Sequence, residues 1–194
     1  GVTKGFAPES QVYAYNWFGD VSEMAAAAAN VQNPIYVSNH SYGLSAEDYF
    51  SSGGSASIFG QYNEDSRDYD LLANNAENYT IVFAAGNDRD SYSLYNPNRN
   101  GKDLLSQGGV SKNTVTVAAT KGTENFTGIT GNQSVSGSNQ FIVGFSNFGP
   151  TDDFRIKPDI AAKGGDVTSI TAAGISATAT YSGTSMAAPA VTGV

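Results

Sequence analysis

The stretch TIVFAAGN, residues 80–87, is a short apolar run that ends in Gly-Asn. β-branched and aromatic side chains fill its first half and small residues its second, which is typical of a buried strand that ends in a turn. Ahead of it, Tyr69, Leu72 and Ala76 recur at helical spacing in a segment that begins at about Asp65. The sequence therefore predicts a helix followed by a buried strand.

Similar units lie on either side of this pair. Residues 11–18 alternate β-forming side chains and predict a strand, and Asp20 with Glu23 three positions on is typical of the capping box of a helix, here one rich in alanine. Residues 34–43 predict a second strand that runs into a polar turn, and the Gly- and Ser-rich residues 51–60 predict a surface insertion. Further strands are predicted at residues 113–120 and 141–150.

Short apolar strands separated by helices favour an α/β fold, a three-layer sandwich with a mostly parallel central sheet covered on both faces. No linker or repeat divides residues 1–194, so we expect a single domain. In such sheets, functional groups gather beyond the carboxyl ends of the strands. Three predicted strand ends are polar and rich in glycine: SNHSYG (38–43), AAGND (84–88) and SNFGP (146–150).

The composition excludes several classes of protein. The chain is 40% hydrophobic and 14% charged, which excludes a disordered chain, and its net charge of −8 argues against a nucleic-acid partner. Without cysteine it has no disulfide, thiolate metal site or thiol nucleophile. No apolar run reaches the roughly 18 residues of a membrane span, and the first residues do not form a signal peptide, so we expect any targeting segment to lie outside this sequence.

The last stretch, SGTSMAAPAVTGV (182–194), places Ser185 among small residues at the predicted start of a helix. A serine there lies at the positive end of the helix dipole, beside unpaired N–H groups, and Pro189 cannot donate a hydrogen bond to the Ser185 carbonyl. Taken alone, these features favour an N-cap serine over a nucleophile.

Two further segments bear on Ser185. Asn87, at the end of a buried strand, could direct its amide N–H groups into a cleft, where such donors stabilise the oxyanion of acyl transfer; in isolation Gly-Asn is better explained as a turn. The segment NHSYG (39–43) could offer its backbone edge to an extended peptide, or could simply be a strand that leads into a loop.

Together, GTSMAAP, FAAGN and NHSYG resemble the subtilisin-like serine proteases, with strand–helix units between them. The resemblance covers the whole chain, since GFAPESQVYAY, FSNFGP and KPDIAAKGG are also similar to segments of that family. It implies that Ser185 is the nucleophile, with Asn87 and the Ser185 N–H as oxyanion donors. It also implies a substrate cleft for a polypeptide, formed by Ser41, Tyr42 and Gly43 on one wall, Ala84, Ala85 and Gly86 along the specificity pocket, and Thr184 beside the nucleophile.

The sequence departs from the family pattern in one important respect. A serine protease of this kind needs a histidine base and an aspartate that orients it, and neither family motif is present. The single histidine, His40, lies in the segment that matches the substrate wall. We therefore expect a partial catalytic domain, incomplete at both ends, whose catalytic Asp and His lie upstream.

The missing part has a structural consequence. In the family, a strand lies between those that match residues 11–18 and 34–40, so its absence would leave two unpaired edges. We expect these two strands to pair directly, or their edges to be covered by self-association.

Three functions remain open from the sequence. The first is a serine endopeptidase, the second a degenerate domain that binds peptides or serves as a scaffold, and the third a non-proteolytic acyl hydrolase. The presence of both Ser185 and Asn87 favours an enzyme. The chemistry requires no cofactor. The resemblance implies an extracellular or cell-surface location and structural calcium, although no Asp-rich loop marks a calcium site.

Overall fold

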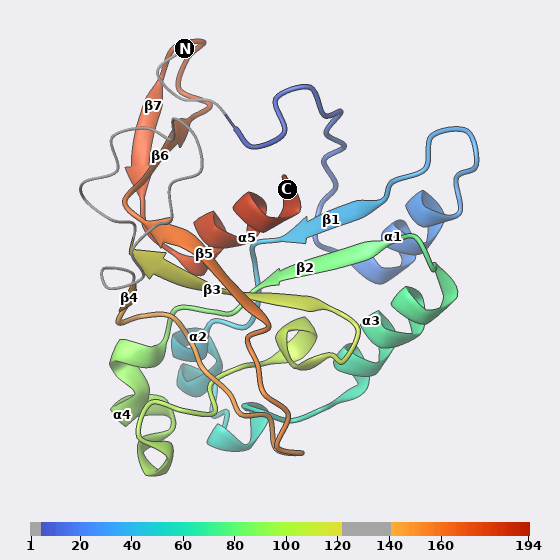
Figure 1. Cartoon of the computed structure of the whole chain (residues 1–194). Coiled ribbons are helices and arrows are strands. Elements are labelled where there is room, and N and C mark those ends of the chain that lie inside the picture. Colours follow the sequence, from blue (N-terminus) through green and yellow to red (C-terminus); the bar gives the residue numbers. More distant parts are fainter. Residues whose placement is uncertain (1–4, 122–140) are drawn as a thin grey trace, which may run out of the picture.

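The computed structural model describes residues 5–121 and 141–194 (Figure 1). Five α-helices and seven strands occur among them, joined by 3₁₀-turns of which η4 (Gln107–Val110) matters for the site. The helices are α1 (Asp20–Ala28), α2 (Ala46–Ser51), α3 (Glu64–Asn75), α4 (Tyr92–Tyr95) and α5 (Thr184–Thr192). The strands are β1 (Val37–His40), β2 (Thr80–Ala84), β3 (Val115–Lys121), β4 (Phe141–Ile142), β5 (Ile160–Gly165), β6 (Val167–Ile170) and β7 (Thr178–Tyr181).

The main sheet is mostly parallel, as the sequence predicted. β1 pairs with β2, β2 with β3 and β3 with β5, all parallel, and only the short β4 runs antiparallel to β3. The register places His40 beside Phe83 and Ala84 beside Val117. A separate antiparallel hairpin is formed by β6 and β7. The carboxyl ends of β1 and β2 therefore lie next to each other, which brings the segments after His40 and Ala84 together.

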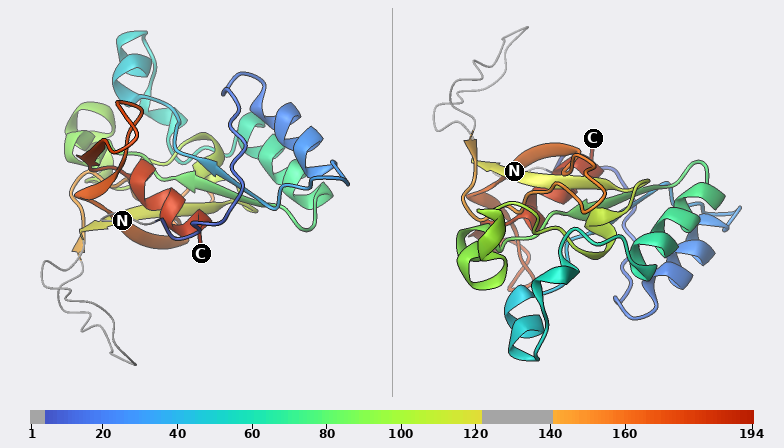
Figure 2. Two further views of the ribbon diagram at one scale, coloured as in Figure 1. Left: turned by 90° about the horizontal axis from the view of Figure 1, so that it is seen from above. Right: turned by 90° about the horizontal axis from the view of Figure 1, so that it is seen from below.

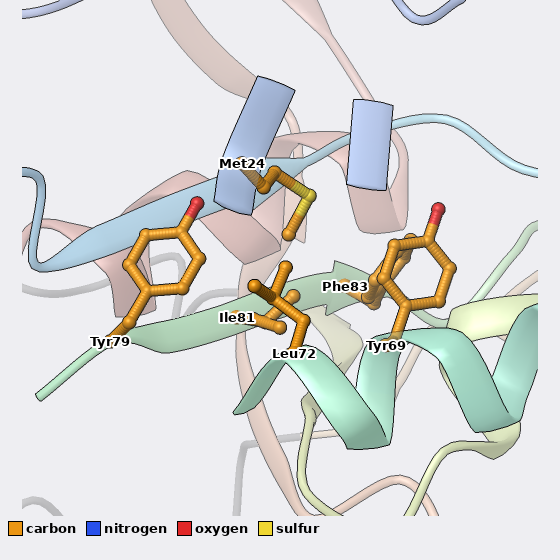
Figure 3. Close-up of a cluster of buried hydrophobic side chains, with 6 residues drawn as sticks. All are labelled: Met24, Tyr69, Leu72, Tyr79, Ile81 and Phe83. Atoms are coloured by element: carbon orange, nitrogen blue, oxygen red, sulfur yellow. The ribbon is translucent and has the colours of Figure 1, made fainter. Parts of the chain in front are cut away.

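Helices cover the two faces of this sheet (Figure 2). Side chains alternate along β2, so Ile81 and Phe83 pack against α1 and α3, whereas Val82 packs against α5 on the other face. Figure 3 shows the first cluster, in which Tyr69 of α3 lies edge-on to Phe83 with ring centroids 4.8 Å apart. The arrangement is the α/β three-layer architecture that the sequence predicted.

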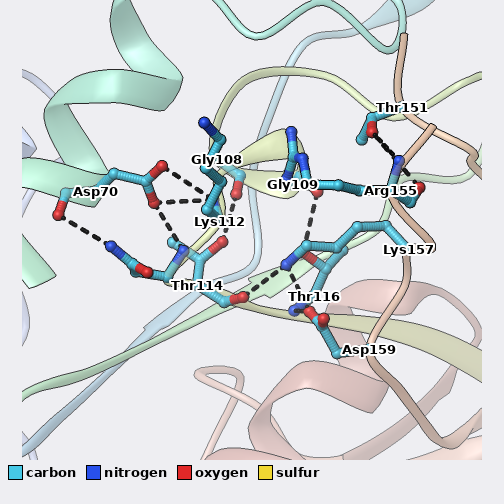
Figure 4. Close-up of polar contacts among 11 residues, drawn as sticks. Asp70, Gly108, Gly109, Lys112, Thr114, Thr116, Thr151, Arg155, Lys157 and Asp159 are labelled. Atoms are coloured by element: carbon cyan, nitrogen blue, oxygen red, sulfur yellow. Dashed lines mark hydrogen bonds and ion pairs between the residues drawn. The ribbon is translucent and has the colours of Figure 1, made fainter. Parts of the chain in front are cut away.

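A network of polar contacts fixes the loop that leads into β3 (Figure 4). The Asp70 carboxylate accepts hydrogen bonds from the backbone N–H groups of Lys112 and Asn113, at 2.7–3.0 Å. On the other side, the buried Lys157 ammonium donates to the Thr114 carbonyl at 2.7 Å and pairs with Asp159 at 2.6 Å. Because η4 immediately precedes this loop, the network also holds η4 in place beneath the carboxyl end of β2.

Residues 11–18 do not form the predicted strand. They are exposed, with Val12 85% and Phe18 79% exposed, and make no backbone hydrogen bond to another segment within the described ranges. Alternation alone cannot make a strand, because a strand also needs a neighbour to satisfy its backbone groups. The expected direct pairing of this segment with residues 34–40 is therefore wrong, and β1 has β2 as its one partner among the described strands.

Two smaller predictions were also wrong. Of the predicted strand at residues 141–150, just Phe141–Ile142 pairs, because the chain then turns to bring Asn147 beside Gly86. Helix α1 begins at Asp20 itself, with Gly19 as its N-cap and no side-chain cap, so Asp20 is not the N-cap that the sequence predicted; its carboxylate accepts from the Tyr42 and Tyr69 hydroxyls and from the Val21 N–H. None of the helices within 5–121 and 141–194 is long and apolar enough to cross a membrane.

Candidate active site

Ser185 occupies the first turn of α5 and faces the segment that follows β1. Its hydroxyl donates to the Ser41 carbonyl at 3.2 Å, and the Ser41 hydroxyl donates to the Ser185 carbonyl at 2.9 Å. The second bond is available because Pro189, four residues on, has no N–H to donate to that carbonyl. The proline thus leaves an acceptor that ties Ser185 to the carboxyl end of β1.

Asn87 lies beside the same helix terminus. Its side-chain Oδ1 accepts hydrogen bonds from the Thr184 N–H at 2.8 Å and from the Thr184 hydroxyl at 3.0 Å. That hydroxyl in turn accepts a bond from the Gly86 N–H at 3.1 Å. With Oδ1 occupied, the orientation of the amide is determined, and its Nδ2 is the end that remains available to a ligand.

Two hydrogen-bond donors near Ser185 are unused. Neither Asn87 Nδ2 nor the Ser185 N–H donates to any of the described residues, although the neighbouring N–H groups of Thr184 and Met186 are both satisfied. An N–H in the first turn of a helix is expected to lack an intrahelical partner. Together with the positive end of the α5 dipole, the two donors suit a negatively charged oxygen next to Ser185.

These donors open into a cavity of about 290 Å³. Ser41 contacts Ser185 without lining the cavity, while the other side chains named from the sequence do line it. The sequence prediction missed its floor, which η4 provides; nothing in the local sequence of η4 marks it as part of a site. The lining includes Tyr42, Gly43, Ala84, Ala85, Gly86, Asn87, Thr184 and Ser185, with Ser106, Gln107, Gly108 and Gly109 from the floor.

Asn147 holds the loop that carries Asn87, a role that the sequence did not reveal. Its side chain accepts from the Asp88 N–H at 2.7 Å and donates to Asp88 Oδ2 and to the Leu104 carbonyl, each at 3.0 Å. Its backbone N–H donates to the Gly86 carbonyl at 3.0 Å. Asn147 thereby holds Gly86 and Asp88, the residues on both sides of Asn87, while the Asn87 side chain makes its hydrogen bonds with Thr184. The resemblance of FSNFGP to a segment of the family marked this asparagine for attention, but only the fold shows which residues it contacts.

His40 lies in a different layer from Ser185. Its ring stacks on Phe83 with centroids 4.6 Å apart, on the side of the sheet that α1 and α3 cover. Nδ1 lies 2.6 Å from the Tyr42 hydroxyl, which itself donates to Asp20, so Nδ1 is the donor of that pair; Nε2, 2.7 Å away, accepts from Ser38. Burial lowers the His40 pKa to about 4 although the nearby Asp20 raises it, so the ring is neutral near pH 7 and carries its hydrogen on Nδ1.

The arrangement can carry out part of an acyl transfer. It supplies a hydroxyl, two free donors for an oxyanion and a cavity for a side chain, but both ring nitrogens of His40 are engaged elsewhere. No base for Ser185 is therefore found within residues 5–121 and 141–194. Nor do three or more Asp, Glu or His side chains gather into a metal site in that part of the chain, so structural calcium stays a prediction.

Several known proteins share this fold. The chain resembles the S41 psychrophilic protease, with 25% sequence identity and a TM-score of 0.61 over 96% of this chain and 53% of that one. It resembles the prenylagaramide maturation protease PagA with 22% identity and a TM-score of 0.58 over 98% of this chain and 55% of that one. It also resembles the subtilase cytotoxin SubAB assembly, with 20% identity and a TM-score of 0.56 over 91% of this chain and 48% of that one. The chain thus spans about half the length of these structures.

The family of the chain follows from its sequence as a whole. No curated protein matches it. The family model for the subtilases, the S8 peptidases, matches all of residues 1–194, including the segments that carry Asn87 and Ser185. The mostly parallel sheet, the free donors and the cavity beside Ser185 agree with this match. The chain belongs to the subtilase family.

Proposed function

We propose that the protein is a serine endopeptidase with Ser185 as its nucleophile and Asn87 as a side-chain oxyanion donor. One observation carries the proposal. Asn87 Nδ2 and the Ser185 N–H are both free, and both residues line the cavity beside the Ser185 hydroxyl. A domain that only binds peptides has no need of two unused donors next to a serine hydroxyl, whereas acyl transfer needs such donors to hold the oxyanion.

The chemistry follows from these groups. Ser185 Oγ attacks the carbonyl carbon of the scissile bond as its proton passes to a base, and the oxyanion is held by the two donors. The intermediate collapses to an acyl-enzyme on Ser185, while the protonated base gives its proton to the departing amine. Water then repeats the sequence and releases the acid. We propose that the base is a histidine, oriented by an aspartate, from a part of the protein outside these 194 residues.

A peptide fits the site better than a small ester. The backbone N–H and C=O groups of Tyr42 and Gly43, just beyond β1, make no hydrogen bond within the described residues, although both residues line the cavity. Free backbone groups at the end of a strand can pair with an extended peptide, which adds to the sheet as a further strand. The extended segment after β1 is therefore proposed as the wall along which the substrate lies.

Three further points belong to this proposal. Members of the family are often exported, and we propose an extracellular or cell-surface location. We also propose that calcium, where present, has a structural role on surface loops and takes no part in the chemistry. Finally, β1 has a free edge among the described strands, and self-association of this chain through that edge is proposed when no other segment covers it.

Peptide hydrolysis by the full-length protein tests the function. A quenched fluorescent peptide should be cleaved by the full chain, and Ser185→Ala should lower kcat by several orders of magnitude with little change in peptide affinity. Cleavage that survives Ser185→Ala would contradict the proposal. Thr168→Ala, on the separate β6–β7 hairpin, is a control that should leave the rate unchanged.

A further inference from the structure

A second cavity, of about 330 Å³, lies next to the first. The two share part of their lining, so a ligand in one adjoins a ligand in the other. The residues common to both are Tyr42, Gly43, Phe83 and Gln107; Trp17, Asp20, Asp65 and Tyr69 line the second cavity alone.

The second cavity is acidic. Asp20 and Asp65 line it, and none of the described residues that line it is a lysine or arginine. Asp20 accepts the hydroxyl hydrogens of Tyr42 and Tyr69, at 2.7 and 2.5 Å, and the N–H of Val21 at 2.8 Å. These neutral donors hold the carboxylate in place without cancelling its charge. Within the described residues neither Asp20 nor Asp65 forms an ion pair, so the cavity retains both negative charges.

Its remaining wall is aromatic. Trp17 is 63% exposed and lies edge-on to Tyr42 with ring centroids 6.2 Å apart, and Tyr69 also lines the cavity. Aromatic faces attract cations, and they also cover the methylene groups of a long side chain. Carboxylates combined with aromatic rings therefore select for the side chain of lysine or arginine over a neutral or acidic one.

Gln107 separates this acidic cavity from the first one. It lines both, and its amide makes no side-chain hydrogen bond within the described residues. The first cavity is less acidic, because Asp88 is the one charged residue among the described residues that line it. The two cavities therefore suit different side chains.

We propose that the second cavity binds the lysine or arginine side chain of a peptide whose reacting residue occupies the first. The inference rests on the proposed function for the identity of the ligand as a peptide. It goes further in assigning a charge preference to a second position of that peptide. Asp65, exposed at the start of α3, and Asp20 provide the attraction, and Trp17 covers the side chain.

Equilibrium binding to the full chain with Ser185→Ala tests this without requiring cleavage. Two peptides are compared that differ at one position, arginine in the first and its uncharged isostere citrulline in the second. At near-physiological salt we expect the arginine peptide to bind about three- to tenfold more tightly. It should also change the fluorescence of Trp17, and Trp17→Phe should remove that part of the signal.

Two neighbouring variants locate the charge. Asp65→Asn should reduce the preference for arginine to about twofold or less, since one of the two carboxylates is lost. Glu64→Gln, the same change one residue away on α3 and outside the cavity, should leave the preference intact. Equal affinity for the two peptides, or a preference unaffected by Asp65→Asn, would overturn the inference.

The outcome is separable from the proposed function. If the protein with Ser185 intact fails to hydrolyse the arginine peptide but Ser185→Ala still prefers it over citrulline, the enzyme proposal fails and the cation site stands. If both peptides are hydrolysed at Ser185 with equal kcat/KM and bind equally, the enzyme proposal stands and the cation site is refuted.

Discussion

Asn87 binds Thr184 through Oδ1 alone, with the Thr184 N–H and hydroxyl donating to the same oxygen at 2.8 and 3.0 Å. One side chain thus combines two tasks. Its oxygen caps the N-terminus of α5, which positions Ser185, and its Nδ2 is left as a donor at the cavity. The two ends of the amide can be separated by mutation, because a carboxylate keeps the acceptor and removes the donor.

Asn87→Asp should therefore fold with the stability of the parent and yet be a poor enzyme. We expect kcat to fall about 10²–10³-fold, the range measured when such a donor is removed from a subtilisin. Asn87→Ala should show the same loss of rate and also a free energy of unfolding about 1 kcal/mol lower, because it loses the cap as well. Kinetics and urea unfolding on both variants check this, and an active Asn87→Asp would contradict the assigned donor.

Asn147 is a positioning residue and should act on rate through Asn87. Asn147→Asp retains the acceptor for the Asp88 N–H but places a second carboxylate beside Asp88 Oδ2 and the Leu104 carbonyl. We expect a free energy of unfolding lower by about 1–3 kcal/mol and a fall in kcat with KM nearly unchanged. The double variant Asn87→Ala with Asn147→Asp distinguishes this role from a merely structural one. Its loss in kcat should be much smaller than the product of the two single losses, because both substitutions act on the same donor. Additive losses would mean that Asn147 does not act through Asn87.

His40 makes the stability depend on pH. Its pKa is about 4 in the folded protein against 6.5 in the unfolded chain, so between these values the unfolded chain binds a proton that the folded one excludes. The free energy of unfolding should therefore fall as the pH falls through this window, by about 2 kcal/mol between pH 7 and pH 5 from this group alone. In His40→Gln, which cannot titrate, that part of the pH dependence should be absent. Identical slopes for the two proteins would refute the assignment of a buried neutral ring.

The buried Lys157 stabilises the entry to β3. Its side chain is 4% exposed, burial lowers its pKa, and its ammonium serves both the Thr114 carbonyl and Asp159. Lys157→Met should lower the free energy of unfolding by about 2–3 kcal/mol, because the Thr114 carbonyl loses its side-chain donor and the Asp159 carboxylate loses its cation, keeping only the Thr116 N–H among the described residues. The exposed Lys102→Met should change it by about 0.5 kcal/mol or less. Similar small effects for both would show that the contacts in Figure 4 contribute little.

The sequence predicted the parts of the fold that depend on local pattern. The buried run that becomes β2 and the periodic side chains of α3 are marked by the residues themselves, and the small residues around Asn87 and Ser185 mark the ends of elements. Because parallel strands bring their carboxyl ends together, those ends converge on one cavity once the strands pair. The positions of Asn87 and Ser185 relative to each other follow from this topology.

Other features depend on contacts that local pattern does not contain. Residues 11–18 alternate like a strand but have no neighbouring strand to bind, so their side chains are exposed or, like Trp17, line a cavity. Asp20 looks like a helix cap but binds two tyrosines from distant segments. The floor formed by η4 and the contacts of Asn147 arise only when loops far apart in the sequence meet.

The central claim is that Ser185 is an activated nucleophile. A fluorophosphonate reacts with an activated serine, and the modified residue can be identified by mass spectrometry of the digested protein. For the full-length protein we predict labelling at Ser185 that is lost in Ser185→Ala and slowed strongly in Asn87→Asp. Residues 1–194 expressed alone should label very slowly, because no base for Ser185 lies among the described residues. Absence of labelling of the full-length protein, or labelling that persists in Ser185→Ala, would contradict the account.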